Sequence, residues 1–331
     1  MKGAATTLDI GPDDAGQRVD RFLRKYLPRA TLSLVFKLLR TKQVVVNGRR
    51  ARPEARLAAG DLLTLFLGDR LADLRGDEQK EGKKPGGSRR AKTPSLVILH
   101  RDEHVLAVDK PARLLVHEGD AGDEPTLIAA VLAAFPGRRG YTFRPALAHR
   151  LDRDTSGVVL VGLSAEGLRG LEEALRRRTV RKTYLALVLG VPDPREGVID
   201  APLKRQDVPK GDRPKVSVGG SRDPEAVTEY RVLGEAGMFA LVEALPRTGR
   251  THQIRAHLRH LGHPILGDPT YGDRRRNEEA RGRYGLWRPF LHALRIELDH
   301  PVTGKPLVIE APLPEELRRV LAALGMRADR A

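Results

Sequence analysis

The chain of 331 residues contains no cysteine, which excludes disulfides, thiolate metal sites and every mechanism with a cysteine nucleophile. Aromatic residues make up only 4% of it. No apolar run approaches the roughly 20 residues that a membrane-spanning helix needs. The N-terminus also lacks the apolar stretch of a secretory signal. From these absences we expect a cytoplasmic protein that has no membrane partner.

Positive charge is what the chain has in excess, with a formal net charge of +16 at pH 7. Such an excess favours a polyanionic partner, usually a nucleic acid, although an Arg-rich genome produces the same bias. Hydrophobic residues make up 40% of the chain, enough for a buried core. The length predicts about two domains.

The segment 16–66 has the pattern of a small α/β domain. Thr31 or Ser33 is placed to cap a second helix, and an Asn47-Gly48 turn follows the strand-like run 44–46. Another short strand is expected over 62–67. The first helix is predicted from apolar residues at spacings of three and four, namely Val19, Phe22, Leu23, Tyr26 and Leu27.

This segment is also the most basic part of the chain. It holds twelve Lys and Arg against three Asp and Glu, a net charge of +9. A solvated basic face would explain this density, but its concentration favours contact with nucleic acid. The runs 18–23 (RVDRFL) and 44–48 (VVVNG) resemble those of an S4 RNA-binding domain. The resemblance implies RNA contacts from two helices, for which the candidates are Arg18, Arg21, Arg40 and Lys42.

Composition divides the chain into three parts. Residues 70–95 are charged, rich in Gly and Pro, and poor in large apolar residues, which predicts a flexible linker. We therefore expect an S4 domain over 1–69 and a second domain over 96–331. A flexible linker would let the two domains dock independently on one RNA.

The second domain is rich in strand-like apolar runs that do not alternate regularly with helices. This pattern predicts an α+β domain with a mixed or mainly antiparallel sheet, rather than a doubly wound fold. Helices are expected over 126–134, 165–177, 251–261 and 314–324. The expected strands are 96–99, 105–108, 158–163, 184–189, 239–244, 294–298 and 307–309.

The densest functional chemistry lies in residues 149–157, HRLDRDTSG. The second half of this run is typical of a turn, but a turn does not explain a carboxylate at Asp152 between Arg150 and Arg153. Neighbouring guanidinium groups favour the ionised form of an acid, which can then act as a nucleophile or a base.

Two later segments add candidate groups. In 249–258, GRTHQIRAHL, Thr251 is placed to cap a helix, and Arg255 borders the apolar stripe of that helix. Tyr184 stands at the entrance of a strand in a chain that has few aromatic residues. Taken singly, a surface arginine and a core tyrosine would explain both residues.

Taken together and in this order, HRLDRDTSG, KTYLALV and GRTHQIRAHL resemble the three motifs of the RluA family of pseudouridine synthases, over about 96–318. The resemblance implies the pseudouridine synthase fold, with Asp152 as the essential aspartate, Tyr184 against the target base and Arg255 as the partner of Asp152. Arg150 would help to hold the flipped-out nucleotide. His149 also matches its motif and is a candidate for substrate contact.

Pseudouridine formation breaks the N1–C1′ bond of a uridine and joins C5 to C1′. The reaction gains and loses no atoms, so the resemblance implies no cofactor and no metal. The sequence agrees, because it contains neither a Gly-x-Gly-x-x-Gly fingerprint nor a Walker lysine motif.

Other functions stay open from the residues alone. A non-catalytic S4 RNA-binding protein is one. A metal hydrolase would use His and Asp ligands, but no HExxH is present and His252 and His257 stand five residues apart. A uridine C5 methyltransferase would resemble enzymes with a cysteine nucleophile, which is absent here. The oligomeric state is not indicated.

Within the family, the chain resembles the branch that modifies large-subunit ribosomal RNA, with tRNA as the alternative target. The segment 117–120, HEGD, departs from that branch by placing an acid where a small residue is expected. The basic, Gly- and Pro-rich segment 204–222 is interpreted as either an RNA-gripping loop or a solvated hairpin.

Overall fold

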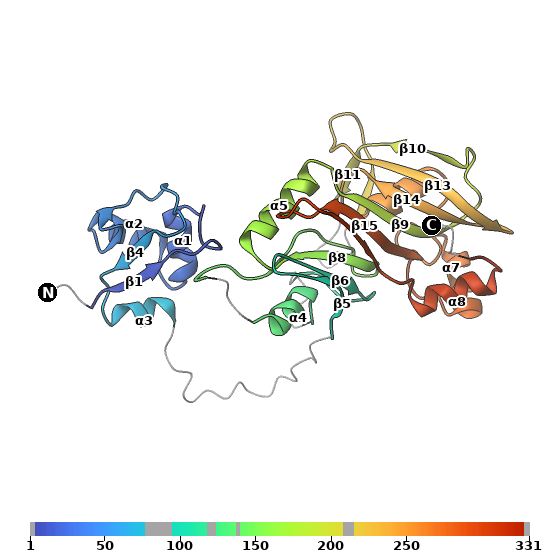
Figure 1. Cartoon of the computed structure of the whole chain (residues 1–331). Coiled ribbons are helices and arrows are strands. Elements are labelled where there is room, and N and C mark those ends of the chain that lie inside the picture. Colours follow the sequence, from blue (N-terminus) through green and yellow to red (C-terminus); the bar gives the residue numbers. More distant parts are fainter. Residues whose placement is uncertain (1–3, 77–94, 118–123, 137–139, 208–214, 328–331) are drawn as a thin grey trace.

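The structure is a computed structural model that describes residues 4–76, 95–117, 124–136, 140–207 and 215–327. Figure 1 shows a small N-terminal domain beside a larger domain built around one extended sheet. Among the described residues, no helix combines the length and apolarity that crossing a bilayer requires.

The N-terminal domain packs helices on a four-stranded sheet of order β1-β4-β2-β3. The five apolar residues whose spacing predicted its first helix are all buried, four of them in the helix and Leu27 at its C-cap. The Thr31 hydroxyl caps the second helix, and Asn47 and Gly48 both have positive φ, as the tight turn requires. The elements are β1 (Thr6–Asp9), α1 (Val19–Tyr26), α2 (Leu32–Arg40), β2 (Val44–Val46), β3 (Arg49–Arg50), β4 (Leu62–Leu65) and α3 (Arg70–Arg75).

Helix α3 lies inside the range that the sequence predicts to be linker. It forms there because Leu71 and Leu74 pack against the apolar core of the N-terminal domain, so this domain continues to about Gly76. The rest of the predicted linker, 77–94, lies outside the described residues, as does most of the segment 117–120.

The larger domain carries a ten-stranded sheet of order β10-β13-β14-β9-β15-β8-β6-β5, with β16 added to β15 and β7 added to β8. Its elements are β5 (Val97–Arg101), β6 (Val105–Lys110), α4 (Leu127–Ala134), β7 (Ala146–Leu147), β8 (Ser156–Gly162), α5 (Ala165–Arg176), β9 (Arg181–Leu189), β10 (Glu196–Asp200), β11 (Leu203–Gln206), β12 (Lys215–Val218), β13 (Val227–Ala236), β14 (Phe239–Pro246), α6 (Gln253–His260), α7 (Arg274–Tyr284), β15 (Leu291–Asp299), β16 (Pro306–Glu310) and α8 (Glu315–Ala323).

The sheet consists of two antiparallel halves that meet at one short parallel contact. Strands β15 and β8 pair in parallel through only two residue pairs, His292 with Ser156 and Ala293 with Gly157. Gly157 has a φ of 119°, and a Cβ there would meet the carbonyl oxygen of Ala293 at 2.1 Å. Only glycine fits this seam, because its backbone approaches the neighbouring strand so closely.

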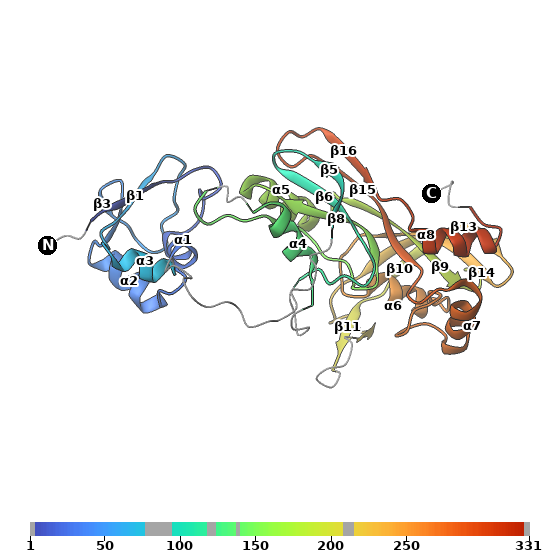
Figure 2. The ribbon, with the colours of Figure 1, turned by 90° about the horizontal axis from the view of Figure 1, so that it is seen from below.

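Strand β8 is buried on both faces, which explains its unbroken apolar sequence. Val159 and Val161 face helix α4 and its core, while Val158 and Leu160 face the core that includes α5. Helices α6, α7 and α8 contribute to the largest core cluster, over the β9–β14–β15 half. Figure 2 shows the helices on both sides of the sheet.

The predicted α+β class and mainly antiparallel sheet are confirmed, and all seven predicted strands and four predicted helices of this domain are present. Strands β10 and β13 were not predicted, because charged residues flank the short apolar pair of β10 and interrupt the apolar residues of β13. Helix α7 was missed because it has almost no apolar stripe: it buries only Ala280. Strands β11 and β12 pair antiparallel over most of the first and middle parts of the segment 204–222, starting at Leu203, and residues 208–214 lie outside the described residues.

Candidate active site

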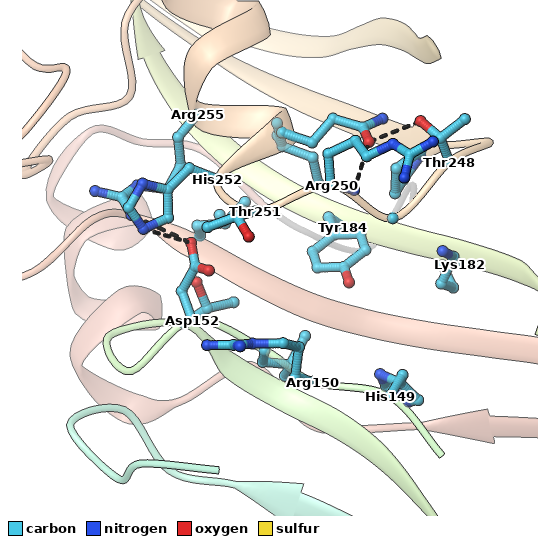
Figure 3. Close-up of a pocket in the computed structure, with 17 residues that line it drawn as sticks. His149, Arg150, Asp152, Lys182, Tyr184, Thr248, Arg250, Thr251, His252 and Arg255 are labelled. Carbon is cyan, nitrogen blue, oxygen red and sulfur yellow. Dashed lines mark hydrogen bonds and ion pairs between the residues drawn. The ribbon is translucent and has the colours of Figure 1, made fainter. Parts of the chain in front are cut away.

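A pocket of about 250 Å³ opens beside the seam, between the loop before β8 and the start of α6. It is lined by all three segments that the sequence singled out, and Figure 3 shows their side chains converging. From the first segment come His149, Arg150 and Asp152. Lys182 and Tyr184 come from β9, and Arg255 comes from α6.

Asp152 lies in a tight turn, which is closed by a 3.1 Å hydrogen bond from the Thr155 N–H to the backbone carbonyl oxygen of Asp152. Two buried basic side chains, Lys110 and Arg288, donate to backbone carbonyls of this turn. The Lys110 Nζ donates to the carbonyl of Arg153 at 3.0 Å, and the Arg288 Nη1 donates to the carbonyl of Asp154 at 3.3 Å. The turn therefore fixes the position of a carboxylate that is only 22% exposed.

Arg255 joins Asp152 to a second carboxylate. Its Nη1 donates to Asp152 Oδ2 at 3.2 Å. Its Nε and Nη2 donate to the two oxygens of Asp268 at 2.7 and 2.8 Å. Asp268 has no exposed surface, and it also accepts the N–H groups of Thr270 and Tyr271. Asp268 is thus the closer partner of Arg255, and Asp152 binds the remaining edge of the guanidinium.

The charge states in this triad follow from its hydrogen bonds. Burial alone would lower the pKa of Arg255, but the hydrogen bond and charge of Asp268, with those of Asp152, raise it above its usual value. Burial also works against ionised Asp268, and the bonds from Arg255 and the backbone nevertheless lower its pKa. Arg255 is therefore a permanent cation beside Asp152.

The start of α6 differs from the prediction at Thr251. The N-cap residue is His252, with a φ of 55° and no side-chain cap, because the chain turns through a left-handed residue there. The Gln253 side chain accepts the Arg250 N–H instead, at 2.9 Å. His252 Nε2 consequently lies 3.9 Å from Asp152 Oδ2, and burial lowers the pKa of His252, so its ring is neutral at pH 7.

Tyr184 forms a wall of the pocket and lies on β9 opposite Ala293 at the seam. Burial, followed by the charge of Asp152, raises the pKa of its phenol, so the hydroxyl stays protonated. Lys182 lies two residues earlier on the same strand, and burial lowers the pKa of its amine. The pocket thus combines one aromatic face with several nitrogen donors.

His149 and Arg150 have different environments. The His149 Nε2 accepts the Leu160 N–H at 3.1 Å, which ties this segment to β8. Burial lowers the pKa of His149 to about 4, and the charge of Lys182 acts in the same direction. Arg150 is exposed at the pocket. Its side chain is therefore the more accessible of the two to a ligand.

The profile of the RNA pseudouridylate synthase family matches residues 104–260. Ribosomal large subunit pseudouridine synthase C of Salmonella typhi is 38% identical over 320 residues, which are 96% of each chain. The protein of that name from Escherichia coli is 38% identical over 95% of each chain. This chain belongs to the RNA pseudouridylate synthase family.

Solved structures agree with this assignment. Human RNA Pseudouridylate Synthase Domain Containing 4 has a TM-score of 0.56 and 29% identity, and covers 70% of this chain and 94% of that one. Human RNA Pseudouridylate Synthase Domain Containing 1 has a TM-score of 0.53 and 25% identity, over 72% and 98%. The predicted RluA family, synthase fold and isomerase class are confirmed.

The synthase structure adds residues that the sequence reasoning missed. Asp268 ends the segment 262–268, GHPILGD, ten residues after the third motif, and this place in the sequence was the one available signal for its role. Lys182 and His252 lie inside the second and third motifs, but nothing in the motifs singled out their side chains. The buried side chains of Lys110 and Arg288 lie outside the motifs. The segments that form the pocket lie far apart in the sequence, so the spacing of residues alone does not show which of their side chains contact one another.

The basic residues predicted in the N-terminal domain divide into two kinds. Arg18 forms a two-bond ion pair with Asp20, at 3.0 and 2.7 Å. Arg21, Arg40 and Lys42 are exposed and form no ion pair within the described residues. The latter three are therefore the more available cations.

Histidines considered as metal ligands also have local roles. His257 is buried and bonds to the Thr228 hydroxyl and the Ala201 carbonyl. Across the described residues, no group of three or more His, Asp or Glu is arranged to hold a metal ion.

Proposed function

We propose that this synthase isomerises specific uridines of large-subunit ribosomal RNA, with Asp152 as the catalytic carboxylate. The observation that carries the proposal is the 3.2 Å hydrogen bond between Asp152 and the buried Arg255, in the pocket that the three motif segments line. The RNA target is supported by the names of the relatives that match along nearly the whole chain.

The target base would enter the pocket as an extruded nucleotide. At about 250 Å³, the pocket is close to the lower limit of small-ligand sites, about 300 Å³. Extrusion costs a few kcal/mol of lost stacking and pairing, roughly as in base-flipping enzymes. Tyr184 supplies a face for the base, while Arg150 at the mouth is placed to bind a phosphate.

Asp152 would act on the ribose side of the reacting nucleotide. Arg255 holds its carboxylate in place through the 3.2 Å hydrogen bond from Nη1 to Oδ2. A carboxylate oxygen of Asp152 either adds covalently to the nucleotide or removes a ribose C2′ proton to give a glycal. Both routes conserve every atom of uridine, so the proposal includes neither cofactor nor metal.

The last step transfers the C5 proton after the new C5–C1′ bond has formed. The raised pKa of Tyr184 means that its resting phenol is not a base. Tyr184 can take up the C5 proton only if its own phenolic proton passes to a water molecule in the same step; otherwise a water molecule accepts the C5 proton directly. We assign Tyr184 this relay, next to its packing role.

The N-terminal domain would bind the surrounding RNA through phosphate contacts. Arg21, Arg40 and Lys42 are its exposed candidates, because none of their side chains forms an ion pair among the described residues. The predicted S4 assignment and the three-part division of the chain belong to this proposal, with the N-terminal boundary moved to Gly76 by helix α3.

The decisive experiment replaces Asp152 by Asn and measures pseudouridine in ribosomal RNA by nucleoside mass spectrometry. We expect no product, with RNA affinity within twofold of the wild type. Asp299→Asn is the matched control, because Asp299 is an exposed acid at the end of β15. Product formation by Asp152→Asn near the control rate would reject the catalytic assignment. Mapping tRNA from a knockout strain in parallel tests the alternative target.

A further inference from the structure

The N-terminal domain is joined to the larger domain by hydrogen bonds to the buried side chain of Asp14. This aspartate has no exposed surface. Its carboxylate accepts the N–H groups of Tyr141 and Thr142, at 2.5 and 2.9 Å, and the Thr142 hydroxyl at 2.6 Å. The Gln17 side chain donates to the same hydroxyl at 2.9 Å. Both partners of Asp14 therefore lie in the other domain.

Several neighbouring contacts support this joint. The Tyr141 ring packs edge-on against Tyr26 at 5.9 Å and adds to the N-terminal core. The Asp13 carboxylate accepts the Ala165 N–H at the start of α5, at 2.7 Å. Gly140 has a φ of 96°, and a Cβ there would meet Asp14 Oδ2 at 2.3 Å. The backbone at Gly140 is thus fitted to the carboxylate.

The joint is connected along the chain to the segment that carries the proposed reacting groups. Residues 140–142 continue through β7 into the loop that carries Arg150 and Asp152. In Figure 1 this segment (green) reaches from the large domain to the N-terminal domain. The arrangement differs from the independent docking that a flexible linker predicts, because contacts far from the linker fix the two domains together.

We infer that Asp14 is a positioning residue that fixes the distance between the RNA-binding face of the N-terminal domain and the catalytic pocket. The synthase then selects uridines that lie at this distance from the RNA element to which the N-terminal domain binds. The inference rests on the proposed function, since it assumes that this domain binds the RNA that carries the target.

A distance measurement tests the joint without any RNA. Since the chain has no cysteine, spin labels can be attached solely at introduced cysteines, Ala59→Cys and Glu172→Cys, which replace exposed residues of the two domains. In the full-length protein we expect one narrow distance distribution. Asp14→Ala should broaden it at least twofold, whereas Asp9→Ala, an exposed acid on β1, should not. An unchanged width in Asp14→Ala overturns the inference.

A kinetic measurement tests the consequence for selection. On a long ribosomal RNA fragment, Asp14→Ala should raise KM about tenfold, because the second contact loses its fixed geometry. Its kcat should stay within twofold, since Asp14 does not line the catalytic pocket. Thr142→Val removes the hydrogen bonds of the Thr142 hydroxyl to Asp14 and Gln17 by a change in the larger domain. This variant replaces Asp14→Ala in the assay if Asp14→Ala fails to fold. Equal KM values for Asp9→Ala and both joint variants would refute the positioning role. Absence of product from the wild type would instead refute the proposed function and leave the distance result standing.

Discussion

The role of Asp268 gives the sharpest prediction, because Asp268 contacts the proposed catalytic pair only through Arg255. Asp268→Asn preserves the shape of the side chain but removes its charge. The amide oxygen can still accept two or three of the four N–H groups that point at the carboxylate. The amide nitrogen then faces a guanidinium N–H at the position where an oxygen stood, so two donors oppose each other.

The magnitude follows from burial. Breaking a buried ion pair by removing one partner costs about 3–5 kcal/mol, because the other charge is left uncompensated. Arg255 keeps its bond to Asp152, so we expect the lower end, about 3 kcal/mol in the free energy of unfolding. The guanidinium also loses one of its three fixed bonds, the one that would meet the amide nitrogen. A displacement of about 1 Å at a reacting group costs roughly a hundredfold in rate, or about 2.7 kcal/mol in the activation barrier.

Two assays measure these effects separately. Urea unfolding at 25 °C gives the free energy of unfolding, and single-turnover release of tritium from uridine labelled at C5 gives the rate of isomerisation. Asp299→Asn controls for the change from acid to amide at an exposed site, where changes are usually within about 0.5 kcal/mol. If Asp268→Asn matched Asp299→Asn in both stability and rate, the idea that Asp268 orients Arg255 would be wrong.

Three further outcomes are expected. We first replace Arg21, Arg40 and Lys42 together by Ala. The plot of log RNA-binding constant against log salt concentration should become less steep by about 2 to 3, since each phosphate contact contributes about 0.9 to the slope. An unchanged slope would place RNA binding elsewhere. Buried His292 has its pKa lowered to about 4, first by burial, so its folded form is neutral and stability falls as pH drops from 6.5 to about 4. His292→Gln should remove roughly 3 kcal/mol of that pH dependence in urea unfolding, and an equally steep profile would contradict the assignment. Tyr184→Phe should slow tritium release about a hundredfold if the phenol relays the C5 proton, and a wild-type rate would assign that role to water.

The sequence predicted the parts of the fold that depend on local pattern. Periodic apolar residues predicted α1, and the unbroken apolar run predicted β8, because each pattern reports a buried face. Helix α7 escaped prediction because ion pairs three and four residues apart, rather than an apolar stripe, line its surface. Strand β13 was hidden by its alternating charges.

At the site, the motifs predicted Asp152, Tyr184 and Arg255 as neighbours, and the structure brings all three to one pocket. What the motifs did not predict is the second partner of Arg255. The Asp268 carboxylate reaches Arg255 from a loop thirteen residues later, and only the three-dimensional arrangement shows that it is buried there. The joint at Asp14 is hidden for the same reason, since its partners lie more than 120 residues away.

The narrow parallel seam has a consequence for how this enzyme loses activity. The turn with Asp152 belongs to one half of the sheet, whereas Tyr184 and Arg255 belong to the other half, and only two residue pairs join the halves along β8 and β15. Mild denaturant that loosens this junction would separate the reacting groups while each half kept its own hydrogen-bonded ladder. Catalysis should therefore disappear at a lower urea concentration than the far-ultraviolet signal of the strands, so that activity reports the docking of the two halves.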